Sequence, residues 1–164
     1  MNNCNIKYIK DKMEFCKMPG GIMAMDIFVL INHSLHNEYP DTYKKNLRLV
    51  GREHLKPIIK NYINKRNTDK IKILKSLLEQ IKILGLGTTK LLVINKHKFI
   101  VNLYKGTFPN QYKKLFGIQK ECVDHFMCGI IEETFDSIFN KKSQVIEKIC
   151  IAQGKKNCIF EITI

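Results

Sequence analysis

The hydrophobic pattern of this 164-residue chain changes its period at two glycines, Gly85 and Gly87. Before these glycines, apolar residues recur at the spacing of amphipathic helices. This spacing predicts three helices, over residues 22–35, 43–63 and 71–84. Asp69 can cap the third helix and Gly85 can end it, because glycine adopts the left-handed conformation easily. Pro57 is expected to kink or divide the second helix, because proline removes a backbone hydrogen bond.

After the glycines, the pattern is typical of two β-hairpins with a helix between them. These three elements are expected over residues 90–104, 121–139 and 143–164. The first hairpin turns at Asn95-Lys96-His97 and ends at Gly106 and Pro109, and the second turns about Gly154. The order of helices, hairpin, helix and hairpin predicts an α+β fold in which helices pack on an antiparallel sheet.

The length suits one domain, which we expect over residues 1–164, with an N-terminal extension of about residues 1–40 and a distinctive tail over residues 121–164. The N-terminus carries charges where a signal peptide would be apolar. The longest apolar stretch, residues 22–31, contains Asp26 and is half of the roughly 20 residues that a membrane span needs. We therefore expect a cytoplasmic protein with no membrane span.

The net charge of +13 is unevenly distributed. Residues 1–120 hold 23 Lys+Arg against 8 Asp+Glu, whereas residues 121–164 hold 5 against 7. Residues 44–75 alone carry eleven Lys+Arg, which could contact nucleic acid phosphates with release of counterions. No nucleic-acid-binding motif accompanies them, so nucleic acid contact is an alternative and not the first hypothesis.

Four of the six cysteines lie in the tail, at Cys122, Cys128, Cys150 and Cys158. Cys150 and Cys158 flank Gly154 symmetrically, so a hairpin centred there makes them face each other. Two thiolates are half of the four ligands that zinc takes. Glu147, three residues before Cys150, can join them only through a bulge or twist of the strand. The spacing leaves open the alternative that these cysteines are small hydrophobes in the core.

The tail also holds a longer progression: a helix glycine, then Glu-x2-Cys, then Ala-x-Gly-x3-Cys-x-Phe-Glu. Its residues are Gly129, Glu147, Cys150, Ala152, Gly154, Cys158, Phe160 and Glu161. In this progression the chain resembles the C-terminal half of the 4-vinyl-reductase-like family of small-molecule-binding or hydrocarbon-binding domains, and it is similar to a stand-alone, archaeal-type member. Residues 49–53 resemble the family's Leu-Gly-Arg-Glu helix, and residues 84–87 resemble the Gly-x-Gly that leads into its central strands.

The resemblance implies helices on an antiparallel sheet with an internal apolar cavity, a fold shared with NO-signalling and Golgi-transport ligand-binding domains. It also implies zinc, because phenol-sensing relatives hold this metal with Glu-x2-Cys-x7-Cys and a cysteine five residues before the helix glycine. Glu147, Cys150 and Cys158 match three of these positions, and the fourth falls on Asp124, whose oxygen can bind zinc. The alternatives for the fourth ligand are Cys122, His125 and Cys128.

Apolar residues of the central hairpin and the following helix are plausible lining residues for the cavity. They are Phe99, Val101, Leu103, Phe126, Met127, Ile130 and Ile131. Such residues form the core more often than they line a ligand site. We expect a domain that binds or senses a hydrophobic or aromatic small molecule, carries a structural zinc ion, and acts alone, as a homodimer or with a separate regulator.

Enzyme motifs are incomplete, so we predict no catalytic residue. Gly85-Leu86-Gly87 lacks the third glycine of a dinucleotide fingerprint, and a Cys122–His125 pair lacks a third catalytic member. The remaining histidines are interpreted as surface or satisfied side chains; they are His33, His36, His54 and His97. A basic regulatory protein that contacts nucleic acid and a reductase acting on a vinyl or aromatic substrate are the alternative functions.

Overall fold

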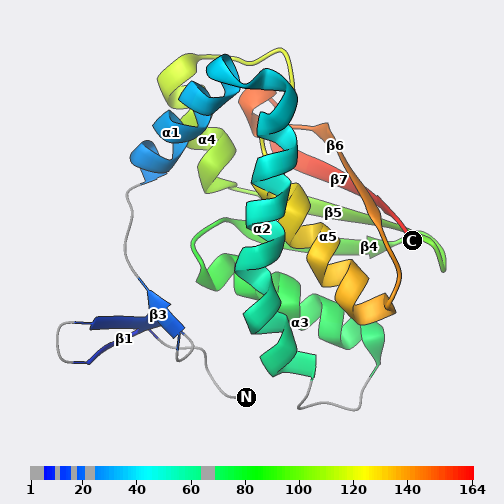
Figure 1. The fold of residues 1–164 in the computed structure, drawn as a ribbon. Coiled ribbons are helices and arrows are strands. Elements are labelled where there is room, and N and C mark those ends of the chain that lie inside the picture. Colours follow the sequence, from blue (N-terminus) through cyan, green and yellow to red (C-terminus); the bar gives the residue numbers. More distant parts are fainter. Residues whose placement is uncertain (1–5, 10–11, 16–17, 21–24, 64–68) are drawn as a thin grey trace.

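A four-stranded antiparallel sheet forms one side of the molecule (Figure 1). The computed structural model describes residues 6–9, 12–15, 18–20, 25–63 and 69–164. The sheet has the strand order β4-β5-β7-β6. Its strands are β4 (Thr88–Val93), β5 (Lys98–Tyr104), β6 (Gln144–Ile149) and β7 (Asn157–Thr163). The hairpin expected over residues 90–104 is confirmed. In the turn between β4 and β5, the His97 amide donates to Asn95 Oδ1 at 2.9 Å.

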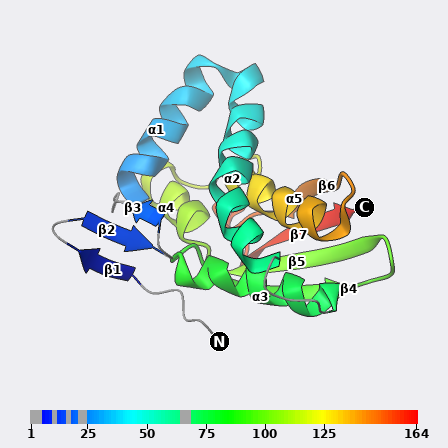
Figure 2. The ribbon, with the colours of Figure 1, turned by 60° about the horizontal axis from the view of Figure 1, so that its bottom comes forward.

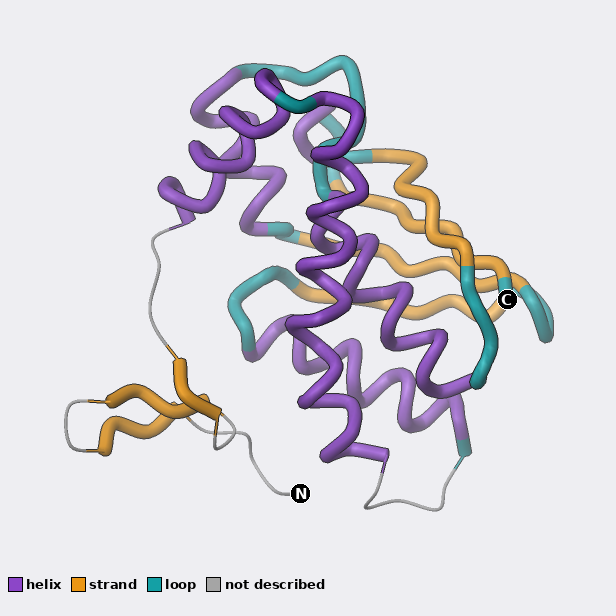
Figure 3. Tube along the Cα trace, in the orientation of Figure 1, coloured by secondary structure: helices purple, strands orange, loops and turns teal. Residues whose placement is uncertain are grey.

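Helices cover one face of this sheet (Figure 2). They are α1 (Met25–Glu38), α2 (Pro40–Ile63), α3 (Lys70–Ile83), α4 (Thr107–Phe116) and α5 (His125–Phe139). A short 3-10 helix, η1 (Ile151–Gln153), connects β6 to β7. A second sheet combines β1 (Ile6–Ile9), β2 (Lys12–Phe15) and β3 (Met18–Gly20). Figure 3 shows the same division into helices on one side and the larger sheet on the other.

Helix α3 has the ends that its sequence predicts. The Ile71 amide donates to Asp69 Oδ1 at 2.9 Å, and Gly85 has a φ of +74° just beyond the helix. Helix α2, by contrast, runs without a break through Pro57. The expected division at this proline is therefore wrong.

Helix α4 is absent from the sequence prediction, which ends the hairpin unit at Gly106 and Pro109. Both residues instead begin a helix, since Gly106 is the N-cap and Pro109 is the third helical residue. Proline is tolerated there because the first amides of a helix have no partner within the helix. Phe108 and Tyr112 are buried on its inner face.

Helix α5 lies between α2 and the sheet and is buried along most of its length. Apolar side chains cover most of this helix, and the arginines of α2 pair with its acidic residues, so both sides can be buried. On one side, Phe135 packs against Phe99 of β5, with ring centroids 5.1 Å apart. On the other side, Gly51 of α2 and Gly129 of α5 let the two backbones meet. A Cβ added to Gly129 would lie 2.0 Å from the carbonyl oxygen of Arg48.

Ion pairs hold α2 and α5 together beside this contact. Arg48 pairs with Glu132, and Arg52 lies 2.8 Å from Asp136 and 3.0 Å from Glu133. These acidic side chains are at most 15% exposed, so solvent screens the pairs only in part. The segment that resembles a Leu-Gly-Arg-Glu helix therefore supplies the glycine and an arginine of a helix crossing.

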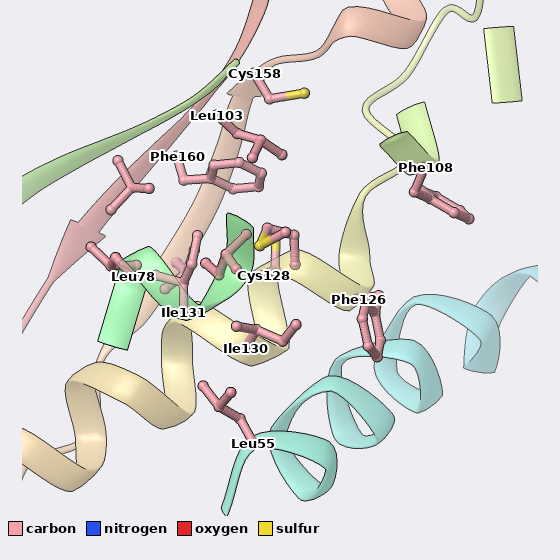
Figure 4. Packing of buried hydrophobic residues seen from close by; sticks show 14 of the residues in the cluster. Leu55, Leu78, Leu103, Phe108, Phe126, Cys128, Ile130, Ile131, Cys158 and Phe160 are labelled. Atoms are coloured by element: carbon pink, nitrogen blue, oxygen red, sulfur yellow. The ribbon is translucent and has the colours of Figure 1, made fainter. Parts of the chain in front are cut away.

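Apolar side chains from α2, α3, α5 and the sheet meet in one core (Figure 4). Leu55, Ile131 and Phe160 are at most 1% exposed there. The predicted N-terminal extension includes α1, whose Val29 is fully buried in the same core. Within the described ranges, no helix is both long enough and apolar enough to cross a membrane.

Candidate metal centre and neighbouring pocket

Glu147, Cys150 and Cys158 come together where β6 leads into β7. Their candidate ligand atoms all lie within 4.8 Å of one another, and the two sulfur atoms are 3.8 Å apart. Both cysteines are fully buried, and Glu147 is 9% exposed. The facing of Cys150 and Cys158 is therefore confirmed, whereas the role of the three residues as metal ligands stays a prediction.

A β-bulge brings Glu147 to the side of the cysteines. The pairing of β6 with β7 shifts register between Glu147 and Ile149. An extra residue at a bulge breaks the alternation of the strand, so residues an odd number of positions apart can share a face. Glu147 and Cys150, three positions apart, accordingly both lie inside. The strand irregularity that the spacing requires is present.

The turn that carries the cysteines is tied to the loop before α5 by Gln153. Its Oε1 accepts a hydrogen bond from the Cys150 amide at 3.1 Å, and its Nε2 donates to the carbonyl of Lys120 at 3.0 Å. The Ile151 amide also donates to Cys158 Sγ at 3.3 Å. Gly154, with a φ of +81°, completes the turn. The position of both thiols therefore depends on the loop as well as on the hairpin.

Asp124 lies beside this group and caps α5. Its Oδ1 accepts from the Met127 amide at 3.2 Å, and its own amide donates to Glu147 Oε2 at 3.0 Å. Asp124 Oδ2 and Glu147 Oε1 are buried and have no hydrogen-bond partner in the structure. Helix α5 thus begins four residues later than predicted, because Asp124 is its cap.

Burial changes the acid–base behaviour of all these groups. It raises the pKa of Asp124 well above its ordinary value and that of Glu147 to about 9. A hydrogen bond from the Cys158 thiol lowers the pKa of Cys150, and the same contact raises the pKa of Cys158. Four acidic groups buried together cannot all ionise without a neighbouring positive charge. A divalent cation would supply that charge, so the donor set fits a metal ion.

The alternative fourth ligands do not join the three residues. Cys122 is half-buried and its thiol donates to Gln153 Oε1 at 3.5 Å. Cys128 is buried within α5, and His125 faces a neighbouring pocket. Among the described residues, the set of mutually close ligand atoms contains neither these side chains nor Asp124. Asp124 differs from the alternatives in its direct contact with the group, since its amide donates to Glu147 Oε2 and its own Oδ2 is unpaired.

The seven residues expected to line an apolar cavity are all part of the core. They are Phe99, Val101, Leu103, Phe126, Met127, Ile130 and Ile131, each at most 9% exposed. Figure 4 shows Leu103, Ile130 and Ile131 within this packed cluster. None of the seven lines the neighbouring pocket. Their contact with a ligand stays a prediction.

The neighbouring pocket, of about 400 Å³, is a feature that the sequence prediction lacks. It lies where α1, α2 and α4 approach the loop before α5. Its lining consists of His36, Tyr43, Lys44, Tyr112, residues 118–123 and His125. The Nδ1 atom of His36 is buried without a partner, so its interpretation as a surface or satisfied histidine is wrong. No spacing signal reveals this pocket, because its residues come from four helices and a loop.

By sequence, the similarity to a relative covers only a short part of the chain. No protein-family model matches the chain. The uncharacterized protein MJ1460 of Methanocaldococcus jannaschii is 39% identical over 44 residues, which is 27% of this chain and 27% of that relative. The match therefore spans about a quarter of the relative's length.

By structure, the similarity covers nearly the whole chain. The phenol-responsive sensory domain of the transcription activator PoxR, with phenol, has a TM-score of 0.86 at 10% identity, over 96% of this chain and 84% of that one. A vinyl-4-reductase family protein from Methanocaldococcus jannaschii has a TM-score of 0.58 at 20% identity, over 88% and 83%.

Two further structures have the same arrangement of helices on an antiparallel sheet. An H-NOX protein from K. algicida has a TM-score of 0.58 at 18% identity, over 87% of this chain and 74% of that one. A trafficking protein particle complex subunit 3 from Naegleria fowleri, covalently bound to palmitic acid, has 0.53 at 12% identity, over 85% and 93%. The expected fold class is therefore confirmed.

Proposed function

We propose that this chain, which has the fold of a 4-vinyl-reductase-like domain, binds a hydrophobic or aromatic small molecule and carries a structural zinc ion. The observation that carries the proposal is the match to a phenol-responsive sensory domain over 96% of the chain. A shared fold does not by itself imply a shared ligand, so the chemistry of this chain's own residues must support the proposal. We take residues 1–164 as one such domain.

Glu147, Cys150 and Cys158 would hold the zinc ion, and Asp124 would complete its set of ligands through Oδ2. Thiolates and carboxylate oxygens are ordinary zinc ligands, and four protein ligands are typical of a structural site. Bound zinc would join the β6–β7 turn to the start of α5. Because the thiols must stay reduced to bind it, we place the domain in the cytoplasm.

The hydrophobic ligand would lie between α5 and the central strand β5. Phe99 and Leu103 of β5 and Ile131 of α5 belong to the same buried cluster, so a ligand would enter by displacing side chains from a closed core. Binding of this kind replaces one set of apolar contacts by another, and its strength depends on the apolar area that the ligand buries. Ile131, which is fully buried on α5, is central to this region.

Nucleic acid contact, the alternative function, loses part of its basis in the fold. Arg48 and Arg52 point their guanidinium groups at the acidic residues of α5. Lys56 pairs with Glu53. These cations of the basic segment are already paired, so they are not free to neutralise phosphates.

Elemental analysis of the purified protein tests the metal. We expect close to one zinc per chain, and loss of most of it in Cys150→Ser and Cys158→Ser. Cys122→Ser is the matched control, because this half-buried thiol lies outside the ligand group, and it should retain its zinc. Wild-type protein without metal, still metal-free after refolding with zinc, would refute this half of the proposal.

Native mass spectrometry of gently purified protein tests the ligand. We expect an additional mass that organic extraction removes and that Ile131→Trp reduces, since the larger ring fills the space between α5 and β5. Thermal unfolding of the variant establishes that it is folded. A wild-type protein that neither retains a ligand nor takes up added aromatic hydrocarbons contradicts the ligand half.

A further inference from the structure

Three polar atoms, one on each of three side chains that line the 400 Å³ pocket, lack a hydrogen-bond partner. They are Tyr43 Oη, His36 Nδ1 and His125 Nδ1, and all three are buried. Buried polar groups in proteins are nearly always paired, and an unpaired one costs about 1–3 kcal/mol. Three of them around one cavity indicate a bound molecule that supplies their partners.

The three side chains converge on one part of the pocket although they come from three helices. The Tyr43 ring lies next to both imidazoles, with its centroid 5.1 Å from that of His36 and 6.1 Å from that of His125. A tyrosine hydroxyl can donate, and a neutral imidazole can carry its proton on Nδ1. All three atoms can therefore donate to one acceptor-rich group.

Positive charge surrounds this part of the pocket. Lys44 and Lys120 line it, and Glu121 is the one acidic lining residue. The Glu121 carboxylate lies 2.7 Å from the Lys44 ammonium, and both side chains are largely exposed at the rim. Lys44 and Glu121 offset each other, so Lys120 leaves one net positive charge at the pocket, which would attract a ligand anion and repel a cation.

The remaining walls are apolar or aromatic. The ring of Tyr112 and the side chain of Val123 are buried against the pocket. Ile118 stands at the rim with 73% of its surface exposed, an unusual fraction for a large apolar side chain. A planar ring bound in the pocket would cover this isoleucine and contact the tyrosines.

We propose that the pocket binds a small aromatic carboxylate, with the carboxylate at Tyr43, His36 and His125 and the ring toward Tyr112 and Ile118. The site is distinct from the closed apolar region between α5 and β5 and shares no residue with it. It also contains none of Glu147, Cys150 and Cys158. Its test has a separate readout, the affinity for an added ligand, although the loop before α5 contacts both the pocket and the candidate metal centre.

Calorimetric titration of the full chain with three probes of matched shape tests the proposal. Benzoate, benzyl alcohol and benzylamine present the same ring with a negative, a neutral and a positive group. We expect benzoate to bind with a Kd of about 1 mM or lower, as suits a ligand of its size. Benzyl alcohol should bind about tenfold more weakly, since hydrogen bonds to a charged group are the stronger ones, and benzylamine should not bind.

Tyr43→Phe is the decisive variant, because it removes only the unpaired hydroxyl. It should weaken benzoate binding about tenfold. The ligand-free variant should be at least as stable as the ligand-free wild type, since an unsatisfied buried hydroxyl is removed. Tyr39→Phe is the matched control, because Tyr39 is 57% exposed and does not line the pocket, and it should bind benzoate like the wild type. Lys44→Gln should also weaken benzoate.

Three results would overturn the proposal. They are no benzoate binding at millimolar concentration, equal binding of benzylamine and benzoate, and equal affinity of Tyr43→Phe and wild type. A wild-type protein that binds benzoate but holds no zinc would contradict only the metal proposal. Retained zinc with no benzoate binding would contradict only the pocket.

Discussion

The carboxylate of Asp124 has a structural contact on one oxygen and none on the other. Oδ1 caps α5 through the Met127 amide, whereas Oδ2 is buried without a partner. Counting five residues back from Gly129 identifies this position from the sequence alone. The sequence does not reveal the cap, since that depends on where the helix begins. One side chain can therefore both start α5 and bind a metal ion.

Asp124→Asn separates these two roles, since asparagine caps a helix as well as aspartate does. We expect the metal-free variant to be as stable as the metal-free wild type. Its affinity for zinc should fall about tenfold or more, because changes to residues that only contact the metal ligands already lower metal affinity by that factor. Chelator competition followed by absorbance measures this. Asp69→Asn, at the cap of α3, is the control and must leave zinc retention unchanged.

At the scale of elements, the crossing of α2 and α5 organises the helical layer. Gly51 and Gly129 permit backbone contact, and a Cβ on Gly51 would lie 2.2 Å from the carbonyl oxygen of Phe126. The ion pairs of Arg48 and Arg52 lie beside it. The segment of α2 that resembles Leu-Gly-Arg-Glu, residues 49–53, is thus explained by packing, because its glycine admits a backbone and its arginine reaches the acidic side of α5.

Gly129→Ala should destabilise the fold although alanine favours helices. In an isolated helix the exchange would stabilise by about 1 kcal/mol. Here the new Cβ would overlap the Arg48 carbonyl, so α2 and α5 must separate, and we expect a loss of about 2–4 kcal/mol in unfolding free energy. Urea denaturation measures it. A stabilised variant would show that the helices do not meet as described.

The stability of the folded chain should depend on pH through His33, which lies at the contact of α1 with α4. Its imidazole bonds to the Tyr112 hydroxyl at 2.8 Å and stacks on Phe116 with centroids 3.6 Å apart. Burial, and next the nearby His36, lower the pKa of His33 below 6.5. The unfolded chain then binds more protons than the folded one as pH falls below 6.5, so folding loses stability in acid.

Unfolding experiments at pH 7.5, 6.5 and 5.5 measure this dependence, and His33→Gln is the variant to compare. We expect the wild type to lose more stability than His33→Gln between the first and last of these pH values. His36 lies close enough to act on the imidazole of His33, so His36→Gln must be measured in parallel. Equal pH slopes for wild type and His33→Gln would contradict the assignment.

At the scale of the whole molecule, one loop links the candidate metal centre to the pocket. Residues 118–123 line the pocket, and the same loop bonds to the β6–β7 connection. The Gln119 amide donates to the Ala152 carbonyl at 2.9 Å, and the Asp124 amide donates to Glu147 at 3.0 Å. An ion held by the hairpin would therefore also hold one wall of the pocket.

Removal of zinc should loosen this wall before the rest of the fold. We expect faster amide hydrogen exchange at Gln119 and Asp124 after chelation, because their acceptors lie on Ala152 and Glu147, in the segment that would hold the ion. The Val101 amide, in the central strand β5, is the internal control and should exchange at its original rate. Exchange followed by NMR distinguishes this local effect from general destabilisation, in which both regions would accelerate together.

Local sequence determined most elements of this protein. The periodicity of α3, its cap at Asp69 and the turn at Asn95 depend on neighbours in the chain, so the pattern predicts them correctly. Cys150 and Cys158 are found for the same reason, since symmetry about Gly154 is a local property. Helix α4 escaped prediction because Pro109 is acceptable only in a first turn, which the pattern does not locate.

Tertiary structure alone decided which side chains meet across elements. The bulge after Glu147 depends on the pairing of β6 with β7, and the pocket at Tyr43 requires four helices and a loop to approach one another. The seven apolar residues illustrate the same limit, since periodicity marks them as inward-facing and packing decides whether they enclose a space. Short-range spacing determines which way a side chain faces, and long-range contacts determine what it faces.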